Sequence, residues 1–154
     1  MATNVTVGQA APDFELPGPD GARVRLRDLR GKKVVLYFYP KSFTGGCTAQ
    51  ACGLRDAYSS FQTEGIEVVG VSVDDVETQR RFRDEYGLQF PVLADVGGVV
   101  SQQYGVYGIT KKDGSVLPEA RRVTFLIDQS GVVRSVIDPA HADVHVAEVR
   151  EALK

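Results

Sequence analysis

The chain has 154 residues and a formal net charge of -2, and its lysines and arginines are scattered along the sequence. This pattern lacks the basic footprint of a protein that binds nucleic acid or an anionic membrane, so we expect neither partner. The length suits a single domain over residues 1–154 that can bury a substantial core.

The N-terminus has neither the basic region nor the apolar region of a signal peptide, and no apolar run reaches the length of a membrane span. We therefore expect a cytoplasmic protein. Its two cysteines are too few for a disulfide scaffold. In a reducing compartment a bridge between them would be transient and catalytic.

The first half of the chain predicts a hairpin, a buried strand and a helix. Two short β-like pieces, 14–16 and 24–26, flank a turn rich in proline and glycine. After a polar bend, the apolar run 33–39 does not alternate with polar residues, which predicts a strand buried on both faces. A helix is expected to begin close to Cys47 and to end at Gly65.

The second half predicts further strands and helices, with Asp74 or Asp75 capping the second helix. The expected elements are a strand over 66–73, a helix over 76–86, a strand over 91–94, a brief helix over 99–104, a loop or surface hairpin over 105–120, strands over 123–127 and 132–137, and a helix over 142–153. This order predicts an α/β protein with a thioredoxin-like fold, in which helices flank a mixed central sheet.

A thiol lies where the buried strand gives way to the helix. The strand ends at Pro40, a short loop with glycines follows, and Cys47 comes at the expected helix start. Unpaired N–H groups and the helix dipole favour a thiolate there. Thr44 adds a hydroxyl that can donate to a thiolate or accept from a substrate O–H. These residues alone support a reactive thiol and an ordinary buried cysteine about equally.

The segment around this thiol also resembles a known family. Pro40, Thr44 and Cys47 match the active-site signature of peroxiredoxins, Pro-x-x-x-Thr-x-x-Cys. The run from Gly46 to Cys52 resembles the Q-type (bacterioferritin-comigratory) subfamily, whose resolving cysteine lies five residues after the peroxidatic one. The resemblance continues through residues 11–14, 90–95 and 122–128.

The resemblance implies a thiol-dependent peroxidase that acts on hydrogen peroxide and organic hydroperoxides without a cofactor. Cys47 would be oxidised to a sulfenic acid, Cys52 would resolve it as an intramolecular disulfide, and thioredoxin or a glutaredoxin-like dithiol would reduce the bridge. Because both cysteines belong to one chain, a monomer suffices. Gly45 stands where the family usually has proline, which loosens the loop, and Gln50 where it usually has glutamate, which removes a charge near the site.

The thiolate needs a cation, because the helix dipole contributes only about 0.3–1 kcal/mol. The resemblance implies that Arg122 corresponds to the conserved arginine of the family. Its guanidinium can hold a thiolate and donate to a peroxide oxygen. Adjacent side chains of an extended segment face opposite ways, so Arg121 is expected to be a solvated arginine at a strand end.

The remaining candidates surround the thiol. Pro40 has no N–H and can keep one side of the site dry, although it also suits an ordinary strand end. Tyr37 and Phe43 could wall a substrate pocket, while aromatic residues beside a central strand are more often plain core. The backbone N–H groups of Gly46 and Cys47 are candidate oxyanion donors.

Two histidines, His141 and His145, are spaced for one helix face. A metal would need further ligands that the neighbouring sequence lacks, so we expect solvated histidines and no metal.

Helix geometry sets a condition on the two thiols. Five residues along a helix place the Cα atoms of Cys47 and Cys52 roughly 8.7 Å apart. A disulfide tolerates Cα separations of up to about 7 Å, so the helix must unwind for the bridge to form. The spacing also lacks the C-x-x-C of disulfide reductases and isomerases. A non-enzymatic redox sensor or holdase remains the alternative function.

Overall fold

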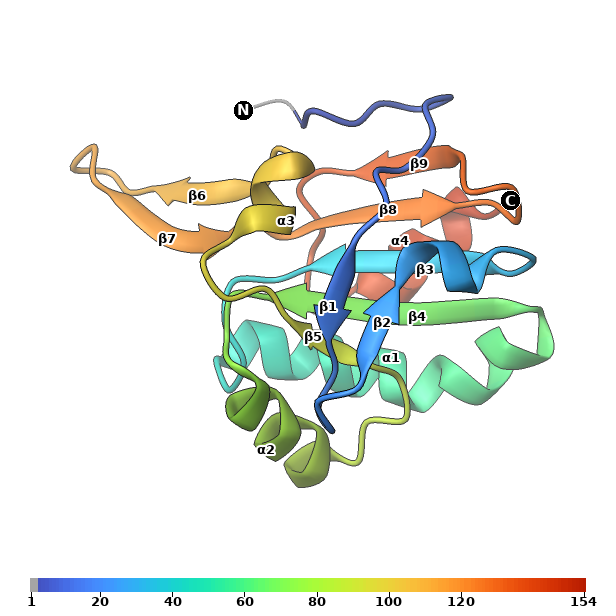
Figure 1. The fold of residues 1–154 in the computed structure, drawn as a ribbon, viewed down its shortest axis with the longest axis horizontal. Helices are drawn as coiled ribbons and strands as arrows, with labels where there is room; N and C mark the ends of the chain where they lie inside the picture. The colour runs from blue at the N-terminus through green and yellow to red at the C-terminus, as the bar shows by residue number, and fades with distance from the viewer. Residues whose placement is uncertain (1–2) are drawn as a thin grey trace.

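The structure is a computed structural model that describes residues 3–154, and a five-stranded sheet lies at its centre (Figure 1). The strands are arranged in the order β5-β4-β3-β8-β9. The three parallel strands are β3 (Lys33–Phe38), β4 (Ile66–Ser72) and β5 (Val92–Ala94), and the antiparallel ones are β8 (Val123–Ile127) and β9 (Val133–Ile137). This is the mixed sheet that the sequence predicts.

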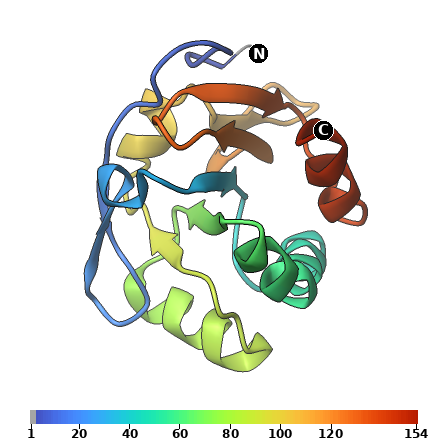
Figure 2. The same cartoon turned by 90° about the vertical axis from the view of Figure 1, so that its right-hand side faces the viewer.

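The central strand β3 is buried on both faces, as its unbroken apolar run predicts. Val35 and Tyr37 face a core shared with α1 (Gly45–Thr63), α2 (Val76–Tyr86) and α4 (His145–Ala152). Leu36 and Phe38 face a second core shared with the N-terminal segment and α3 (Val99–Gln103). Figure 2 shows α1 and α4 on one side of the sheet and the N-terminal hairpin and α3 on the other.

Two hairpins lie outside the central sheet. The predicted N-terminal hairpin consists of β1 (Glu15–Pro17) and β2 (Arg23–Arg25), and a short 3-10 helix, η1 (Leu26–Leu29), forms the polar bend. The segment predicted as a loop or a surface hairpin is a hairpin, with β6 (Tyr107–Thr110) paired to β7 (Val116–Ala120), and it projects from the body in Figure 1.

The helix ends follow the predicted capping residues. Asp75 caps α2 by accepting a hydrogen bond from the Thr78 N–H at 2.8 Å, and Gly87 ends the helix in a left-handed conformation with φ of 62°. The C-terminal helix begins at His145, three residues later than predicted, because 141–144 form a turn in which Val144 N–H bonds to the carbonyl of His141. None of the helices described is long and apolar enough to cross a membrane.

Candidate active site

Cys47 lies in the first turn of α1, directly after the loop that follows β3. Thr44 is the N-cap residue in an extended conformation, and its carbonyl accepts the first helical hydrogen bond, from Thr48 N–H, at 2.9 Å. The side chain of Cys47 is buried, whereas Cys52 is half-buried further along the same helix. Both thiols are free, and α1 is continuous through them.

Arg122, the residue before β8, covers the sulfur of Cys47. Its Nη2 atom lies 3.3 Å from Cys47 Sγ, and its Nη1 atom donates to Gln50 Oε1. The guanidinium passes over Gly46, where a Cβ atom would lie 3.1 Å from Nη2. The absence of a side chain at Gly46 therefore makes room for the arginine beside the thiol.

A buried polar network fixes the loop that leads to Cys47. The Ser42 N–H donates to Asp74 Oδ2 at 2.8 Å, and the Ser42 hydroxyl donates to Gln79 Oε1 at 2.8 Å. The Tyr39 hydroxyl donates to the same Gln79 oxygen at 2.9 Å. Asp74 is the alternative capping residue predicted from the sequence. It accepts hydrogen bonds from Ser42 of the loop and Ser72 of β4, while Asp75 caps α2.

Thr44 and Phe43 adopt distinct positions in this loop. The Thr44 hydroxyl donates to the carbonyl of Lys41 at 2.9 Å, which leaves its oxygen free to accept a further hydrogen bond. Phe43 has a φ of 70°, a left-handed conformation that costs roughly 1–2 kcal/mol for an L-residue. Its ring packs against Phe82 and Tyr86 of α2, with centroids 5.2 and 6.2 Å apart, and stays 46% exposed.

The other predicted residues of the wall are Pro40 and Tyr37. Pro40 is half-buried between β3 and the loop. Tyr37 is buried in the same core as Cys47, stacks on Tyr39 with ring centroids 5.3 Å apart, and lies across Gly70, where a Cβ atom would come within 2.8 Å of the tyrosine. Burial raises the pKa of Tyr37 well above its ordinary value. Tyr37 is therefore a residue of the core, the alternative that the sequence also allows.

Arg121 is not the solvated arginine that we expected. Its side chain is only 19% exposed, and its Nη1 atom pairs with Asp138 Oδ1 at 2.9 Å. Its Nη2 atom donates to the carbonyl of Gly105 at 3.1 Å. The two arginines contact different partners, as expected, but Arg121 is mostly buried by its contacts with Gly105 and Asp138.

The expectation of solvated histidines is correct for His141 and wrong for His145. His141 is exposed, and its Nδ1 atom lies 2.7 Å from Glu148 Oε2. His145 is 2% exposed, and its Nε2 atom lies 2.7 Å from Thr124 Oγ1 on β8. Burial lowers the pKa of His145 to about 4, so the ring is neutral at physiological pH.

Gln50 is a contact of the site that the sequence indicates only as a departure from a family pattern. It is 1% exposed and touches Arg122, as described above. Its position, three residues after Cys47, places both side chains near one another on the helix, and this spacing is the signal that could have indicated it.

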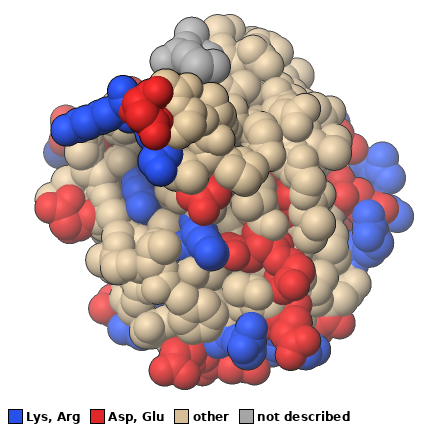
Figure 3. All heavy atoms as spheres, turned by 90° about the vertical axis from the view of Figure 1, so that its left-hand side faces the viewer, with Lys and Arg blue, Asp and Glu red and all other residues tan. Residues whose placement is uncertain are grey.

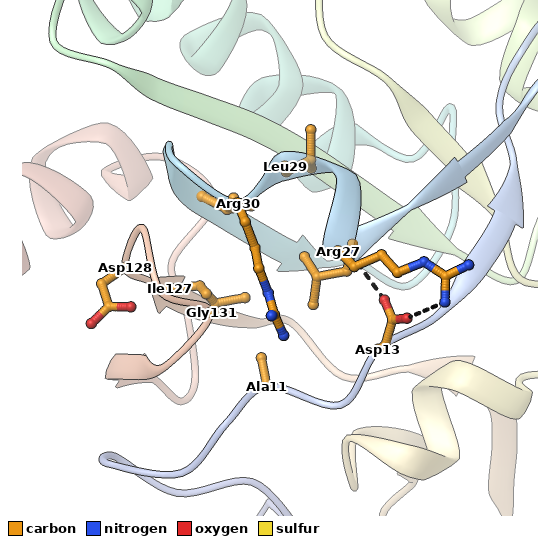
Figure 4. Close-up of a pocket in the computed structure, with 10 residues that line it drawn as sticks. Ala11, Asp13, Arg27, Leu29, Arg30, Ile127, Asp128 and Gly131 are labelled. Atoms are coloured by element: carbon orange, nitrogen blue, oxygen red, sulfur yellow. Dashed lines mark hydrogen bonds and ion pairs between the residues drawn. The ribbon is translucent and has the colours of Figure 1, made fainter.

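Figure 3 shows acidic and basic side chains interspersed over the face that carries the β6–β7 hairpin. A small pocket lies between the N-terminal segment, η1 and the β8–β9 turn, where Arg27 pairs with Asp13 at 3.4 Å and Arg30 lies over Gly131 (Figure 4). None of the predicted site residues lines this pocket.

A free cysteine in the first turn of a helix, with an arginine at its sulfur and a mixed sheet beneath, defines a thiol-dependent redox enzyme. The model of the AhpC/TSA family matches residues 7–136. Peroxiredoxin Bcp of Escherichia coli is 40% identical over 147 residues, which cover 96% of this chain and 94% of that protein. The chain therefore belongs to the AhpC/TSA family, as a peroxiredoxin of the Bcp/PrxQ type.

Solved structures give the same result and confirm the predicted thioredoxin-like fold. Peroxidoxin BcpB from Mycobacterium tuberculosis superposes with a TM-score of 0.86 at 35% identity and covers 97% of both chains. The bacterioferritin comigratory protein of Xanthomonas campestris superposes with a TM-score of 0.86 at 25% identity, over 99% of this chain and 97% of that one.

Proposed function

We propose that this peroxiredoxin reduces peroxides through a sulfenic acid on Cys47, which Cys52 resolves as a transient intramolecular disulfide. The observation that carries the proposal is the contact between Arg122 Nη2 and Cys47 Sγ at 3.3 Å, in a buried first turn of a helix. A guanidinium and free helix N–H groups together favour the thiolate, which is the nucleophile.

The oxidation step follows from these groups. The thiolate attacks the distal oxygen of ROOH, the S–O bond forms as the O–O bond breaks, and the departing RO⁻ takes up a proton to leave as ROH. Arg122 donates to the oxygen on which charge develops. The N–H groups of Gly46 and Cys47 precede the first helical hydrogen bond and can donate as well.

Three features shape the substrate side of the site. Thr44, whose own hydrogen is directed at the Lys41 carbonyl, offers its oxygen to the O–H of the peroxide. Pro40 presents no N–H that could hold water near the sulfur. Phe43 adds exposed apolar surface in the same loop, which suits the organic group of a hydroperoxide, while Tyr37 would support the site from the buried core.

Resolution requires a change in α1. In the reduced helix the two Cα atoms are held roughly 8.7 Å apart, beyond the limit of about 7 Å for a disulfide. The turns from Cys47 to Leu54 therefore unwind once the sulfenic acid has formed. Cys52 then attacks the sulfenic sulfur, water leaves, and a disulfide links the two residues.

The bridge is reopened by an outside dithiol, and thioredoxin or a glutaredoxin-like protein has the required chemistry. Both thiols belong to one chain, so the cycle needs only a monomer, and a reducing cytoplasm would supply the donor. The bacterioferritin comigratory protein of Xanthomonas campestris is described as having alkyl peroxide reduction activity, which supports organic hydroperoxides as substrates here.

The test is a coupled assay with thioredoxin, thioredoxin reductase and NADPH, run with hydrogen peroxide and an organic hydroperoxide side by side. We expect many turnovers per enzyme with both substrates, and none for Cys47→Ser. One stoichiometric oxidation without turnover would contradict the enzyme and support a redox sensor or holdase instead.

A further inference from the structure

The guanidinium of Arg122 is held on α1 by two side chains of that helix. Nη2 donates to Cys47 Sγ at 3.3 Å, and Nη1 donates to Gln50 Oε1. Gly46 leaves the space that the guanidinium occupies. The helix thus offers the arginine one sulfur and one neutral oxygen.

Arg122 differs in this respect from the other partly buried arginines of residues 3–154. Each of those pairs with a carboxylate: Arg55 with Asp56, Arg83 with Asp20, Arg121 with Asp138 and Arg150 with Glu64. No carboxylate in the described part of the chain lies within ion-pair distance of Arg122, so its charge is not neutralised by a fixed anion.

Gln50 is poorly suited to a purely structural role. Its side chain is 1% exposed, and its Nε2 atom has no hydrogen-bond partner among the residues described. A buried unpaired amide N–H destabilises a fold, and an apolar side chain of similar size would avoid that penalty. The feature of Gln50 that the site uses is its oxygen, which contacts Arg122.

We propose that Gln50 is a positioning residue that holds the Arg122 guanidinium beside the Cys47 sulfur and, because it is neutral, leaves the positive charge of that arginine to the sulfur. A glutamate in the same place would form a charge-assisted pair with Arg122 and compete with the thiolate for it. The proposal rests on the proposed role of Cys47 as the reacting thiol.

Two titratable groups packed around the site, His145 and Tyr37, stay neutral near pH 7. His145 of α4 is neutral there because burial lowers its pKa to about 4. Tyr37 of β3 is neutral because burial raises its pKa. Cys52 is the remaining thiol, and replacing it by serine leaves Cys47 as the single cysteine that can ionise.

The experiment titrates that thiol by its ultraviolet thiolate absorbance in Cys52→Ser protein, without peroxide. Adding Gln50→Glu should raise the titration midpoint by about one pH unit. The control Gln103→Glu makes the same charge change at an exposed residue of α3, on the opposite face of the sheet, and should leave the midpoint unchanged. Equal midpoints for the two variants would overturn the proposal.

Two further variants separate positioning from a direct effect of the new charge. In an Arg122→Ala background, Gln50→Glu should move the midpoint much less, whereas an undiminished movement would show that the carboxylate acts on the thiol directly. Gln50→Met removes the oxygen without adding charge, and should slow peroxide attack about tenfold at a pH above the titration midpoint, where the thiol is ionised in both proteins. An unchanged rate for Gln50→Met would contradict the positioning role, even if Gln50→Glu failed to fold.

The titration requires no turnover, so its outcome is independent of the proposed function. Wild-type protein that consumes no peroxide would refute the enzymatic role of Cys47 and leave the measured effect of Gln50 on the thiol intact.

Discussion

Arg122 and Cys47 are 75 residues apart in the sequence, and Arg122 Nη2 lies 3.3 Å from Cys47 Sγ. The register of the sheet explains the contact. Phe38 at the end of β3 is paired with Val123 at the start of β8, so the residue before β8 lies beside the loop that leads into α1. The pairing of β3 with β8 therefore places the guanidinium of Arg122 beside the thiol of Cys47.

Replacing Arg122 by alanine should slow oxidation of Cys47 by roughly tenfold to a hundredfold, the effect expected for a hydrogen bond to a charged group worth about 1.5–3 kcal/mol. The rate can be followed by quenching the reaction with an alkylating agent and counting free thiols by mass. Arg121→Ala is the matched control. It loses the pair with Asp138 and should lower stability while leaving the oxidation rate close to wild type. Similar rates for the two variants would show that Arg122 has no special role.

Gly45→Pro should stabilise the reduced protein by about 0.4–1 kcal/mol, because proline restricts the unfolded chain. Gly45 is the first residue of α1, and a Cβ atom there meets nothing within 4 Å. Thr44 before it has φ of -78° and ψ of 155°, the conformation that proline favours in its predecessor. Urea unfolding measures the change.

Gly53→Pro provides the contrast for this prediction, because it places proline in the interior of the same helix. It should lower the free energy of unfolding by about 3 kcal/mol or more. A Gly45→Pro protein that unfolds at lower urea than wild type would mean that the loop needs the freedom of glycine.

Stability should fall as the pH drops from 6.5 toward 4, because His145 is buried neutral in the fold and its pKa is lowered from 6.5 to about 4. Between these values the unfolded chain binds the proton and the native protein does not, so acid favours unfolding by up to roughly 3 kcal/mol. His145→Phe should be less stable at neutral pH, through loss of the bond to Thr124, yet show a flatter pH dependence. Equal slopes in wild type and variant would refute this assignment.

Amide hydrogen exchange should reveal the unwinding of α1. The reduced protein has a continuous helix over Gly45–Thr63, so amides from residue 48 onward should be protected. In the disulfide form, exchange over residues 45–56 should be much faster, while the end of the helix near Phe61, which packs in the core, stays protected. Equal protection of residues 45–56 in the two redox states would contradict the unwinding step.

The sequence predicts those features of the fold and site that depend on local patterns. The unbroken apolar run of β3, the Asp75 cap of α2 and the cysteine at a helix start follow from neighbouring residues. The position of Arg122 beside the thiol was expected from a family motif, and the structure brings the two together.

Features that depend on packing between distant segments were not predictable in the same way. A histidine pair spaced for one helix face looks solvated until α4 packs on β8 and buries His145 against Thr124. Arg121 becomes partly buried only because the chain at Gly105 and Asp138 closes over it. The spacing of Gln50 from Cys47 indicates that the two side chains are near one another, but its contact with an arginine 72 residues away depends on the packing of distant segments.

The central claim is that Cys47 is the thiol that peroxide oxidises and Cys52 the thiol that resolves it. The most direct measurement treats Cys52→Ser and Cys47→Ser proteins with one equivalent of peroxide and a dimedone-type probe for sulfenic acid, followed by peptide mass mapping. We predict a probe adduct on Cys47 in Cys52→Ser protein and none in Cys47→Ser protein. An adduct on Cys52, or no adduct on Cys47, would contradict the account.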